Sequence, residues 1–453
     1  MDTIAAIATP PIKGGLGVIR ISGSASREVA ARLFVSETGK NMAAMPGYTA
    51  AFGHVYDGGE RLDEAVALVF AAPKSYTGED VVELSCHGGV YILRRVLETC
   101  LKNGARLAEP GEFTKRAFLN GKIDLTGAEA VMDMIGAENQ MALKAALTVH
   151  SGALFEKISS VKDELLSAQA AFSAWVDFPD DEIPELLPER LTALLRASIA
   201  ELEALLAGYD GGRILREGVN TAIAGSPNTG KSTLMNRLAG IARSIVSPVA
   251  GTTRDVVTQA VNIGGIPFNL ADTAGIRQSA DEVEKIGVEL ARRELEKADL
   301  LLAVFDGSRE LEPEDSALLD SLPEANVMAL LNKSDLPQKL LPGNFKGRFA
   351  AVLCVSAATG DGINLLLAEM ERFARQWLSS PAAITVANER QRAATRLAVD
   401  SLVEAIAALE QGLAPDAVSV CVDSALSPLL ELTGERVTDA VTRQIFSRFC
   451  VGK

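Results

Sequence analysis

Nine consecutive residues carry the groups needed to bind a phosphate chain. From Gly225 to Thr233 they read Gly-Ser-Pro-Asn-Thr-Gly-Lys-Ser-Thr, which fits the phosphate-loop pattern G-x-x-x-x-G-K-[ST]. The glycines let successive backbone N–H groups turn toward a phosphate, Lys231 brings positive charge to its oxygens, and Ser232 offers a hydroxyl to Mg²⁺. The sequence predicts a nucleotide site whose residues in this loop are Asn228, Thr229, Gly230, Lys231, Ser232 and Thr233.

Later stretches have the residue types that a guanine nucleotide requires. In Asn-Lys-Ser-Asp at 332–335, Asp335 can accept hydrogen bonds from guanine N1–H and the exocyclic amine, a donor pair that adenine lacks. Within Ser356-Ala357, a backbone amide would meet guanine O6. Asp272 would hold Mg²⁺ through water, and the Gly275 amide would meet the γ-phosphate. The predicted contacts here are Asp272, Thr273, Ala274, Gly275, Asn332, Lys333, Asp335, Ser356 and Ala357.

A Gly-Thr-Thr-Arg-Asp stretch at 251–255 occupies the place of a mobile switch. We expect Thr253 to supply Mg²⁺ with a second hydroxyl, alongside Ser232. Taken alone, each of these stretches is also typical of a turn or a helix cap. Because all five occur in order, each at the end of a predicted strand, together they predict GTP binding.

One residue that related switches use is absent. Ile276 follows Asp-Thr-Ala-Gly, where Ras-like proteins carry a glutamine that orients the attacking water. An isoleucine cannot position water. Another residue must therefore do so, and some cation must offset the charge of the transition state.

The segment around these motifs alternates between strand and helix patterns. A Gly264-Gly265 pair predicts a tight hairpin between the second and third strands. The remaining strands are expected in β-α-β units with a parallel sheet. The predicted strands are Val219–Ala224, Val257–Ile263, Ile266–Asp272, Leu300–Asp306, Val327–Asn332 and Ala350–Val355.

The flanking segments differ from this pattern. Leu125 to Arg216 is almost wholly helical, with a break at Asp177–Pro184 and a boundary signal at Gly211-Gly212, and the helical pattern resumes at Asn388. The first 118 residues mix short strands with helices. Their predicted strands are Thr3–Thr9, Gly17–Ser22, Glu64–Ala71 and Asp80–Ser85, and their predicted helices are Ser26–Phe34, Val90–Asn103 and the amphipathic Glu112–Asn120.

These patterns predict a multidomain protein of α+β and α/β class. We expect an N-terminal α+β domain at 1–118, a helical domain in two parts at 119–217 and 378–453, and a P-loop domain at 218–377. The simplest account inserts the P-loop domain into the helical domain, which requires the ends of the insert to lie close together.

Composition narrows the possible partners and compartments. The net charge of −15 argues against unaided binding to a nucleic-acid backbone or an anionic membrane. Five scattered cysteines without a C-x-x-C pair indicate reduced thiols in the cytoplasm. No signal pattern or membrane-length apolar run is present. The Cys-Val-Gly-Lys tail from Cys450 does not fit a prenylation signal.

Beyond the GTPase motifs, five stretches make the chain resemble the MnmE (TrmE) family of tRNA-modifying GTPases. They are Gly14–Gly23, Thr77–Gly89, Pro110–Lys122, the Gly251–Asp255 switch and the terminal Phe449–Lys453. The resemblance covers the whole chain in the family's domain order. The glycine-rich start and the terminal Cys-Val-Gly-Lys are its specific features, because the GTPase motifs are shared with many other proteins.

This resemblance implies that the N-terminal domain binds a tetrahydrofolate derivative, the 5-formyl or 5,10-methylene form, and dimerises the protein. The implied folate contacts are Arg20, Glu83, Lys122 and Lys453. Two cations and a carboxylate suit a pterin edge and a glutamate tail. Without the resemblance, Arg20 in an apolar strand is better interpreted as a paired, half-buried arginine.

In the GTPase domain, the family uses K⁺ in place of an arginine finger. The resemblance implies a side-chain ligand from Asn228, with Ser247, Val249 and Thr252 completing the shell, so that Ser247 and Thr252 also border the nucleotide. Pro248 is unusual in this loop. The water-orienting acid of the family matches Glu284, which from sequence alone is one of several acids on a solvated helix. Two facing GTPase domains would order the potassium loop.

The implied output is modification of the wobble uridine of certain tRNAs at C5. A tetrahydrofolate one-carbon unit and an amine, glycine or ammonium, would give an aminomethyl-type (carboxymethylaminomethyl) group. A flavoprotein partner, MnmG (GidA), would carry the FAD and help to bind the tRNA. Cys450 matches a cysteine implicated in this chemistry, although a small buried residue is the alternative interpretation. The rival function is a regulatory or ribosome-assembly GTPase switch without tRNA chemistry.

Overall fold

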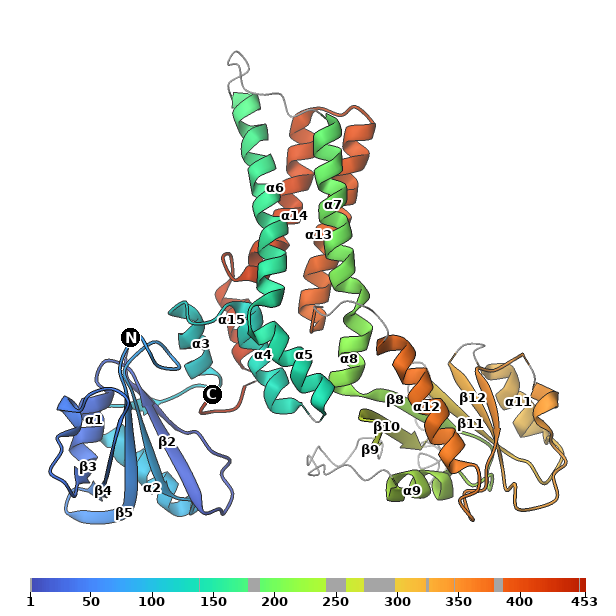
Figure 1. Cartoon of the computed structure of the whole chain (residues 1–453), viewed down its shortest axis with the longest axis horizontal. Coiled ribbons are helices and arrows are strands. Elements are labelled where there is room, and N and C mark those ends of the chain that lie inside the picture. Colours follow the sequence, from blue (N-terminus) through green and yellow to red (C-terminus); the bar gives the residue numbers. More distant parts are fainter. Residues whose placement is uncertain are drawn as a thin grey trace, which may run out of the picture. The chain divides into compact units, whose positions relative to one another are not determined.

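The computed structural model describes residues 2–137, 139–177, 188–241, 258–272, 298–322, 326–345, 347–378, 386–447 and 449–453. The chain divides into two compact units. One unit comprises residues 1–135, 147–202 and 393–453, and the other comprises residues 136–146 and 203–392. Each unit is described by itself below (Figure 1).

The N-terminal part of the first unit is a seven-stranded mixed sheet with two helices. Its strand order is β3-β4-β5-β6-β2-β1-β7, antiparallel except for the β1–β7 pair. The strands are β1 Ile4–Ile7, β2 Leu16–Ser22, β3 Phe34–Ser36, β4 Thr49–Asp57, β5 Glu60–Phe70, β6 Val81–His87 and β7 Arg106–Leu107; the helices are α1 Ser26–Leu33, α2 Val90–Lys102 and the short 3₁₀ helix η1 Met42–Ala44.

The two faces of this sheet differ in exposure: one is buried under helices, and the other carries exposed residues. One face packs against α1 and α2 in a core that includes Leu33, Val55 and Val96. Because side chains alternate along a strand, residues between the core positions point the other way. Val35, Phe52 and Val66 lie there with 59%, 46% and 42% of their surface exposed, and Phe52 pairs directly with Val66. We call these three residues the apolar sheet face.

The sequence patterns miss part of this sheet. The predicted β1, β2, β5 and β6 are confirmed within a few residues, but β3, β4 and β7 are not predicted. Strand β4 reads Thr-Ala-Ala-Phe-Gly-His-Val-Tyr-Asp, with two alanines and a glycine in place of β-branched residues. Gly53 is required because a Cβ there would lie 2.2 Å from the Val35 backbone oxygen.

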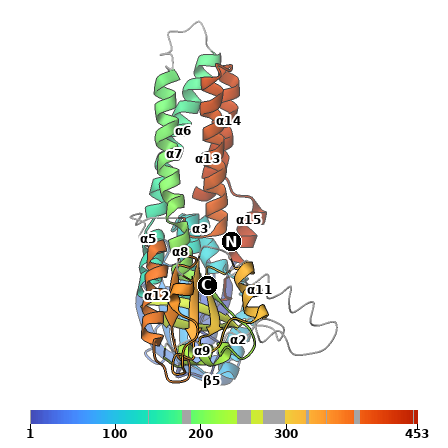
Figure 2. The ribbon, with the colours of Figure 1, turned by 90° about the vertical axis from the view of Figure 1, so that its right-hand side faces the viewer.

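Helices make up the rest of the first unit and confirm the two helical blocks; part of α5 and the ends of α7 and α13 belong to the second unit. Helices α6, α7, α13 and α14 run side by side in both views of the chain (Figures 1 and 2). Helices α6 and α14 are joined by a hydrogen bond from Gln169 Nε2 to Ser419 Oγ of 2.8 Å. The helices are α3 Glu112–Leu119, α4 Leu125–Gly136, α5 Gln140–His150, α6 Ala153–Asp177, α7 Pro188–Ala207, α13 Glu389–Glu410, α14 Pro415–Thr433 and α15 Asp439–Phe446.

The second unit contains a six-stranded sheet of order β13-β12-β11-β8-β10-β9. All neighbours are parallel except the β9–β10 hairpin, as predicted. The strands are β8 Val219–Ala224, β9 Thr258–Ile263, β10 Ile266–Asp272, β11 Leu300–Asp306, β12 Val327–Asn332 and β13 Ala351–Cys354; the helices are α8 Tyr209–Glu217, α9 Lys231–Ile241, α11 Pro313–Ser321, α12 Ile363–Leu378 and the 3₁₀ helix η3 Pro342–Phe345.

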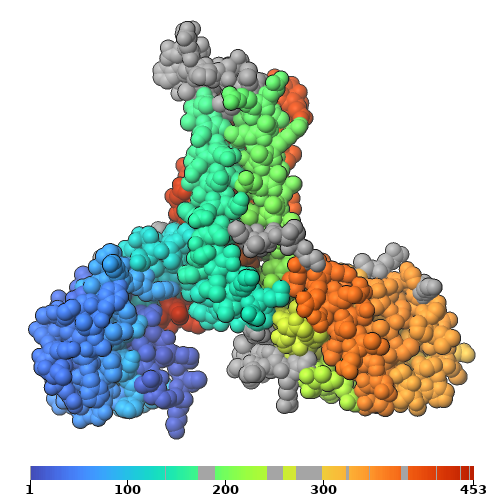
Figure 3. All heavy atoms as spheres, in the orientation of Figure 1, coloured from blue at the N-terminus to red at the C-terminus, as the bar shows by residue number. Residues whose placement is uncertain are grey.

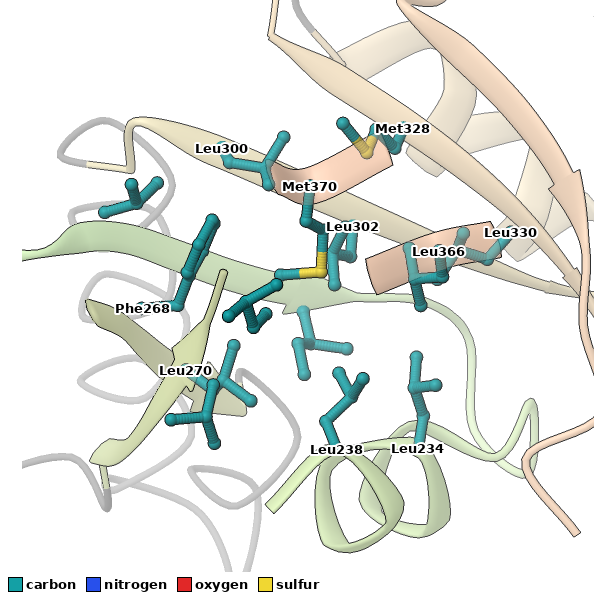
Figure 4. Packing of buried hydrophobic residues seen from close by; sticks show 14 of the residues in the cluster. Leu234, Leu238, Phe268, Leu270, Leu300, Leu302, Met328, Leu330, Leu366 and Met370 are labelled. Carbon is teal, nitrogen blue, oxygen red and sulfur yellow. The ribbon is translucent and has the colours of Figure 1, made fainter. Parts of the chain in front are cut away.

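A continuous apolar core holds this sheet against its helices. Leu234 and Leu238 of α9 and Leu366 and Met370 of α12 pack against strand residues such as Phe268 (Figure 4). Strands β11 and β12 are buried along their whole length, as expected for central parallel strands. The strand ends that carry the nucleotide motifs are therefore firmly placed.

The predicted boundary at Gly211-Gly212 is wrong, because both glycines lie inside helix α8. Gly211 is needed there for packing, since a Cβ would lie 2.6 Å from the Trp377 backbone oxygen. The segments that enter and leave the sheet domain do lie close together. The Val386 N–H donates to the Leu205 carbonyl at 3.3 Å.

Candidate functional sites

The phosphate loop lies between strand β8 and helix α9, in the predicted strand–loop–helix order. Two residues take left-handed backbone conformations, Asn228 with φ of 62° and Gly230 with φ of 96°. Gly225 has no room for a side chain, because a Cβ would lie 2.4 Å from the Val304 carbonyl oxygen. The loop backbone is thus curled tightly over the end of β8, as a phosphate cradle requires.

Hydrogen bonds within the loop converge on one carbonyl. The Ser226 oxygen accepts from Thr229 Oγ1 and from the buried Lys231 ammonium, both at 2.8 Å. Ser232 and Thr233 follow in the exposed first turn of α9, where the helix end favours anions. The loop therefore presents a cation, two hydroxyls and a helix N-terminus together.

The predicted guanine-binding residues come together beside this loop. Asn332 links the stretches: its Nδ2 donates to the Thr229 carbonyl at 2.7 Å, and its Oδ1 accepts the Ala357 N–H at 2.9 Å. Ser356 Oγ donates to Asp335 Oδ1 at 2.5 Å. The Ser356 and Ala357 amides, one of which is predicted to meet guanine O6, both donate within the protein, to the Asp361 carbonyl and to Asn332 Oδ1.

Lys333 has a partner that the sequence patterns do not reveal. Its backbone is left-handed, with φ of 64°, and its Nζ donates to Asp306 Oδ2 at 2.6 Å. Burial alone raises the pKa of the Asp306 carboxyl, but hydrogen bonds from Lys333 and Ser308 outweigh it, so the pKa lies below its usual value. The carboxylate therefore stays charged under Lys333.

Several predicted residues cannot be placed. Asp272 ends strand β10, but its side chain lies outside the described part of the chain. The residues wholly outside it are Ser247, Val249, Thr252, Thr253, Thr273, Ala274, Gly275 and Glu284.

A second constellation surrounds Arg20 on the exposed side of the N-terminal sheet. Arg20 pairs across the strands with Glu83, and its Nε donates to Glu83 Oε1 at 2.8 Å. The guanidinium carbon lies 5.5 Å from the centre of the Tyr76 ring and 5.6 Å from that of Phe113. Both distances fall within cation–π range. An oriented, half-buried cation therefore stands between two aromatic rings.

The C-terminal segment closes this constellation. Arg20 Nη1 donates to the Gly452 carbonyl at 3.4 Å, and the Phe113 N–H donates to the backbone oxygen of Lys453 at 3.2 Å. Gly452 is buried with φ of 100°. Figure 3 shows red C-terminal atoms against the blue and teal N-terminal ones. Of the four implied folate residues, Arg20 and Glu83 therefore pair directly, and the backbone of Lys453 is held next to them by Phe113.

Lys122 lies farther along the same surface. It is exposed, and its Nζ donates to the Pro73 carbonyl at 3.3 Å. Nearby, Asn120 Nδ2 donates to the Thr77 carbonyl at 2.7 Å. Lys122 therefore contacts the loop that carries Tyr76, without a direct contact to Arg20 among the described interactions.

Cys450 is exposed, and its carbonyl accepts the Gly111 N–H at 3.4 Å.

A buried ion network fixes the two rings around Arg20. Arg116 is 2% exposed and pairs with Glu79 at 3.0 Å and with Glu112 at 3.0 Å. Glu79 belongs to the loop of Tyr76, and Glu112 opens α3 one residue before Phe113. The network therefore joins the two elements that carry the rings. Sequence reasoning missed Tyr76 and Phe113, because ring contacts across distant segments leave no spacing signal.

No group of three His, Cys, Asp or Glu side chains in the described ranges is arranged to hold a metal ion. Among the helices the structure describes, none is long and apolar enough to cross a membrane.

Comparison with known proteins places the chain in a family. Residues 125–450 match the family described as "MnmE helical domain", and residues 3–122 match "GTP-binding protein TrmE N-terminus". The curated "tRNA modification GTPase MnmE" of Symbiobacterium thermophilum is 44% identical, covering 100% of this chain and 99% of the relative. The proteins of the same name from Enterococcus faecalis and Carboxydothermus hydrogenoformans are 41% and 40% identical, covering 100% of this chain and 98% and 99% of theirs.

Among solved structures, Era of Aquifex aeolicus bound to GDP·AlF₄⁻ is 29% identical, covers 40% of this chain and 65% of its own, and has a TM-score of 0.28. The curated relatives span the whole chain. The chain therefore belongs to the MnmE (TrmE) family of tRNA modification GTPases and is a GTP hydrolase.

Proposed function

We propose that this GTPase modifies the wobble uridine of certain tRNAs at C5, together with a flavoprotein partner, MnmG (GidA). The product would be an aminomethyl-type (carboxymethylaminomethyl) group, with its methylene carbon taken from a tetrahydrofolate derivative and its nitrogen from an amine, glycine or ammonium. The named relatives support the tRNA part of this proposal. The net charge of −15 supports a division of labour in which the partner supplies positive charge for tRNA.

The observation that carries the proposal is the Arg20 constellation. A cation–carboxylate pair flanked by two rings fits a flat heterocycle that needs both a donor and an acceptor. Arg20 and Glu83 would bind the pterin edge, and Lys453 and Lys122 would hold the acidic tail of the folate. Cys450, exposed in the segment that closes the constellation, would act on the one-carbon unit.

In the GTPase domain, Lys231 would exchange the Ser226 carbonyl for the β/γ-phosphate oxygens, and Ser232 would provide a hydroxyl to Mg²⁺. Asn228 would provide a side-chain ligand to K⁺, together with Ser247, Val249 and Thr252. Glu284 would orient the attacking water. Bound K⁺ would supply the positive charge that an arginine finger supplies elsewhere.

We further propose that the protein is a homodimer formed through its N-terminal domain. The apolar sheet face of Val35, Phe52 and Val66 supports this, because large exposed apolar residues gathered on one face are typical of protein interfaces. A dimer would also contain two GTPase domains, which could face each other and order the potassium loop as the family resemblance implies.

Calorimetric titration of the full chain with 5-formyltetrahydrofolate tests the proposal. We expect saturable binding that Arg20→Ala weakens at least about ten-fold, since hydrogen bonds to charged groups contribute ~1.5–3 kcal/mol. Arg27→Ala is the matched control. Arg27 also pairs with a carboxylate in this domain, Asp80 at 3.1 Å, and its side chain is about as exposed as that of Arg20. We expect this control to bind like the unchanged protein.

The rival function, a regulatory or ribosome-assembly switch, gives the opposite result. Such a switch has no use for a pterin site beside the C-terminal segment. Absence of folate binding, with GTP hydrolysis intact, would favour this rival.

A further inference from the structure

A buried carboxylate on helix α11 contacts the phosphate loop. Asp315 lies in the first turn of α11 and is 1% exposed. Ser226, the second residue of the phosphate loop, is also buried, and its Oγ donates to Asp315 Oδ1 at 2.6 Å. The two residues are 89 positions apart in the sequence. No motif described above includes Asp315.

The position of Ser226 affects the rest of the phosphate loop, because Ser226 contacts other loop residues as well as Asp315. Its carbonyl accepts from Thr229 and Lys231, both at 2.8 Å, while its hydroxyl is bound on the other side by Asp315. A displacement of Ser226 would therefore move the acceptor that places the Lys231 ammonium. In a binding loop, ordering before the ligand arrives raises affinity.

Asp315 is also suited to remain charged. Burial by itself raises the pKa of its carboxyl, but hydrogen bonds from Ser226, the Glu312 backbone and Arg309 outweigh it, so the pKa lies below its usual value. Arg309 Nη1 donates to Asp315 Oδ2 at 2.7 Å. A charged acceptor binds a hydroxyl more strongly than a neutral one.

Arg309 also links Asp315 to the predicted guanine-binding stretch at 332–335. Arg309 Nε lies 3.9 Å from Asp306 Oδ2, the oxygen that accepts from Lys333 at 2.6 Å. A series of contacts thus runs from the Ser226 hydroxyl through the alternating charges of Asp315, Arg309 and Asp306 to Lys333. It joins the two ends of the nucleotide site through groups that are mostly buried.

We propose that Asp315 is a positioning residue for nucleotide binding, which holds Ser226 so that the phosphate loop is ordered for its ligand. Arg309 and Asp306 couple this position to Lys333. The inference rests on the GTP-hydrolase assignment and is independent of the tRNA proposal.

The alternative role for Asp315 is to cap helix α11. Glu312 and Asp315 form a capping box, in which each side chain accepts from the backbone N–H of the other residue. Glu312 is exposed and its Oε1 lies 3.2 Å from Arg309 Nη1, but no described interaction joins it to the phosphate loop. Glu312→Ala therefore removes half of the cap and is a matched control.

The test measures dissociation of N-methylanthraniloyl-GDP from the full chain, with Mg²⁺ present and unlabelled GDP as the chase. We expect Asp315→Asn and Ser226→Ala each to dissociate roughly ten-fold faster than the unchanged protein, because each removes the charge-assisted bond. The double variant is expected to be no faster than the faster single variant. Glu312→Ala should stay within about two-fold.

Three results would overturn the proposal. They are an unchanged rate for Ser226→Ala, independent additive effects in the double variant, and an equal effect of Glu312→Ala and Asp315→Asn. If Asp315→Asn does not fold, Ser226→Ala decides alone, since it removes one hydroxyl. Failure of the unchanged protein to bind the probe would instead remove the GTP-hydrolase assignment, whereas loss of folate binding would leave this inference untouched.

Discussion

At the scale of single residues, the nucleotide site stores backbone strain at two side-chain-bearing positions. Asn228 and Lys333 have φ values of 62° and 64°, and a left-handed conformation costs an L-residue roughly 1–2 kcal/mol. Asparagine tolerates this region better than most residues. Both positions belong to predicted nucleotide-binding motifs, and such strain commonly persists where function needs the geometry.

The strain at Asn228 allows a sharp test of the potassium hypothesis. We expect GTP hydrolysis by the unchanged protein to be faster in K⁺ than in Na⁺, and Asn228→Ala to be equally slow in both salts. Asn228→Gly is the matched variant, because it also lacks the amide ligand but relieves the backbone strain. Hydrolysis rates in the two salts decide the matter. If Asn228→Gly keeps the preference for K⁺, the side chain is not a ligand.

The functional residues were predictable only where contiguous sequence encodes them. Lys231, Asn332 and Asp335 belong to fixed motifs, and the structure brings them together. Tyr76 and Asp315 make contacts between segments far apart in the chain, and neither their residue type nor their spacing distinguishes them from an ordinary aromatic residue or a helix cap.

At the scale of elements, the C-terminal segment behaves as part of the N-terminal domain. Two backbone hydrogen bonds from the start of α3 and one from Arg20 hold it in place. Gly452 makes the close approach possible, because a Cβ would lie 2.3 Å from the Ile7 carbonyl oxygen. The geometry around Arg20 therefore depends on a residue that carries no side chain.

Gly452→Ala should separate this contact from general stability. The added methyl group meets the Ile7 carbonyl, so we expect the segment to shift and 5-formyltetrahydrofolate affinity to fall by about ten-fold or more. Gly39→Ala is the control, since Gly39 has φ of 71° with nothing within 4 Å of its added Cβ. It bears similar backbone strain away from the segment. Calorimetry of both variants measures their folate affinity, and thermal unfolding measures their stability. Unchanged folate affinity in Gly452→Ala would contradict a role for the C-terminal segment.

Helices and strands were predictable from the sequence where their burial requires a recognisable pattern of apolar residues. Strands β8, β10, β11 and β12 match their predicted bounds, because each is a mainly apolar run that ends at or just before a polar motif. Strand β4 has one exposed face and small residues where the neighbouring β3 approaches closely. Its pattern carries too little apolar alternation to be recognised.

At the scale of the whole molecule, the apolar sheet face allows the proposed dimer to be tested. We expect the unchanged protein to sediment as a dimer and the double variant Phe52→Asp, Val66→Asp as a monomer, because two charges would be desolvated in the interface. Leu365→Asp on helix α12 is the control, since Leu365 is 64% exposed outside the N-terminal domain. A dimer that survives the double variant would place the interface elsewhere.

The pairing of α6 with α14 also has a consequence in time. Roughly 240 residues separate the end of α6 at Asp177 from the start of α14 at Pro415. At about 5–20 residues per second, a ribosome needs on the order of ten to fifty seconds to deliver the second helix after the first. Throughout that interval α6 has no contact with α14, and by its end the intervening phosphate-loop domain has been synthesised in full. The nascent chain can thus fold its phosphate-loop domain before α6 pairs with α14. Its demand for chaperones should therefore peak before α14 is synthesised.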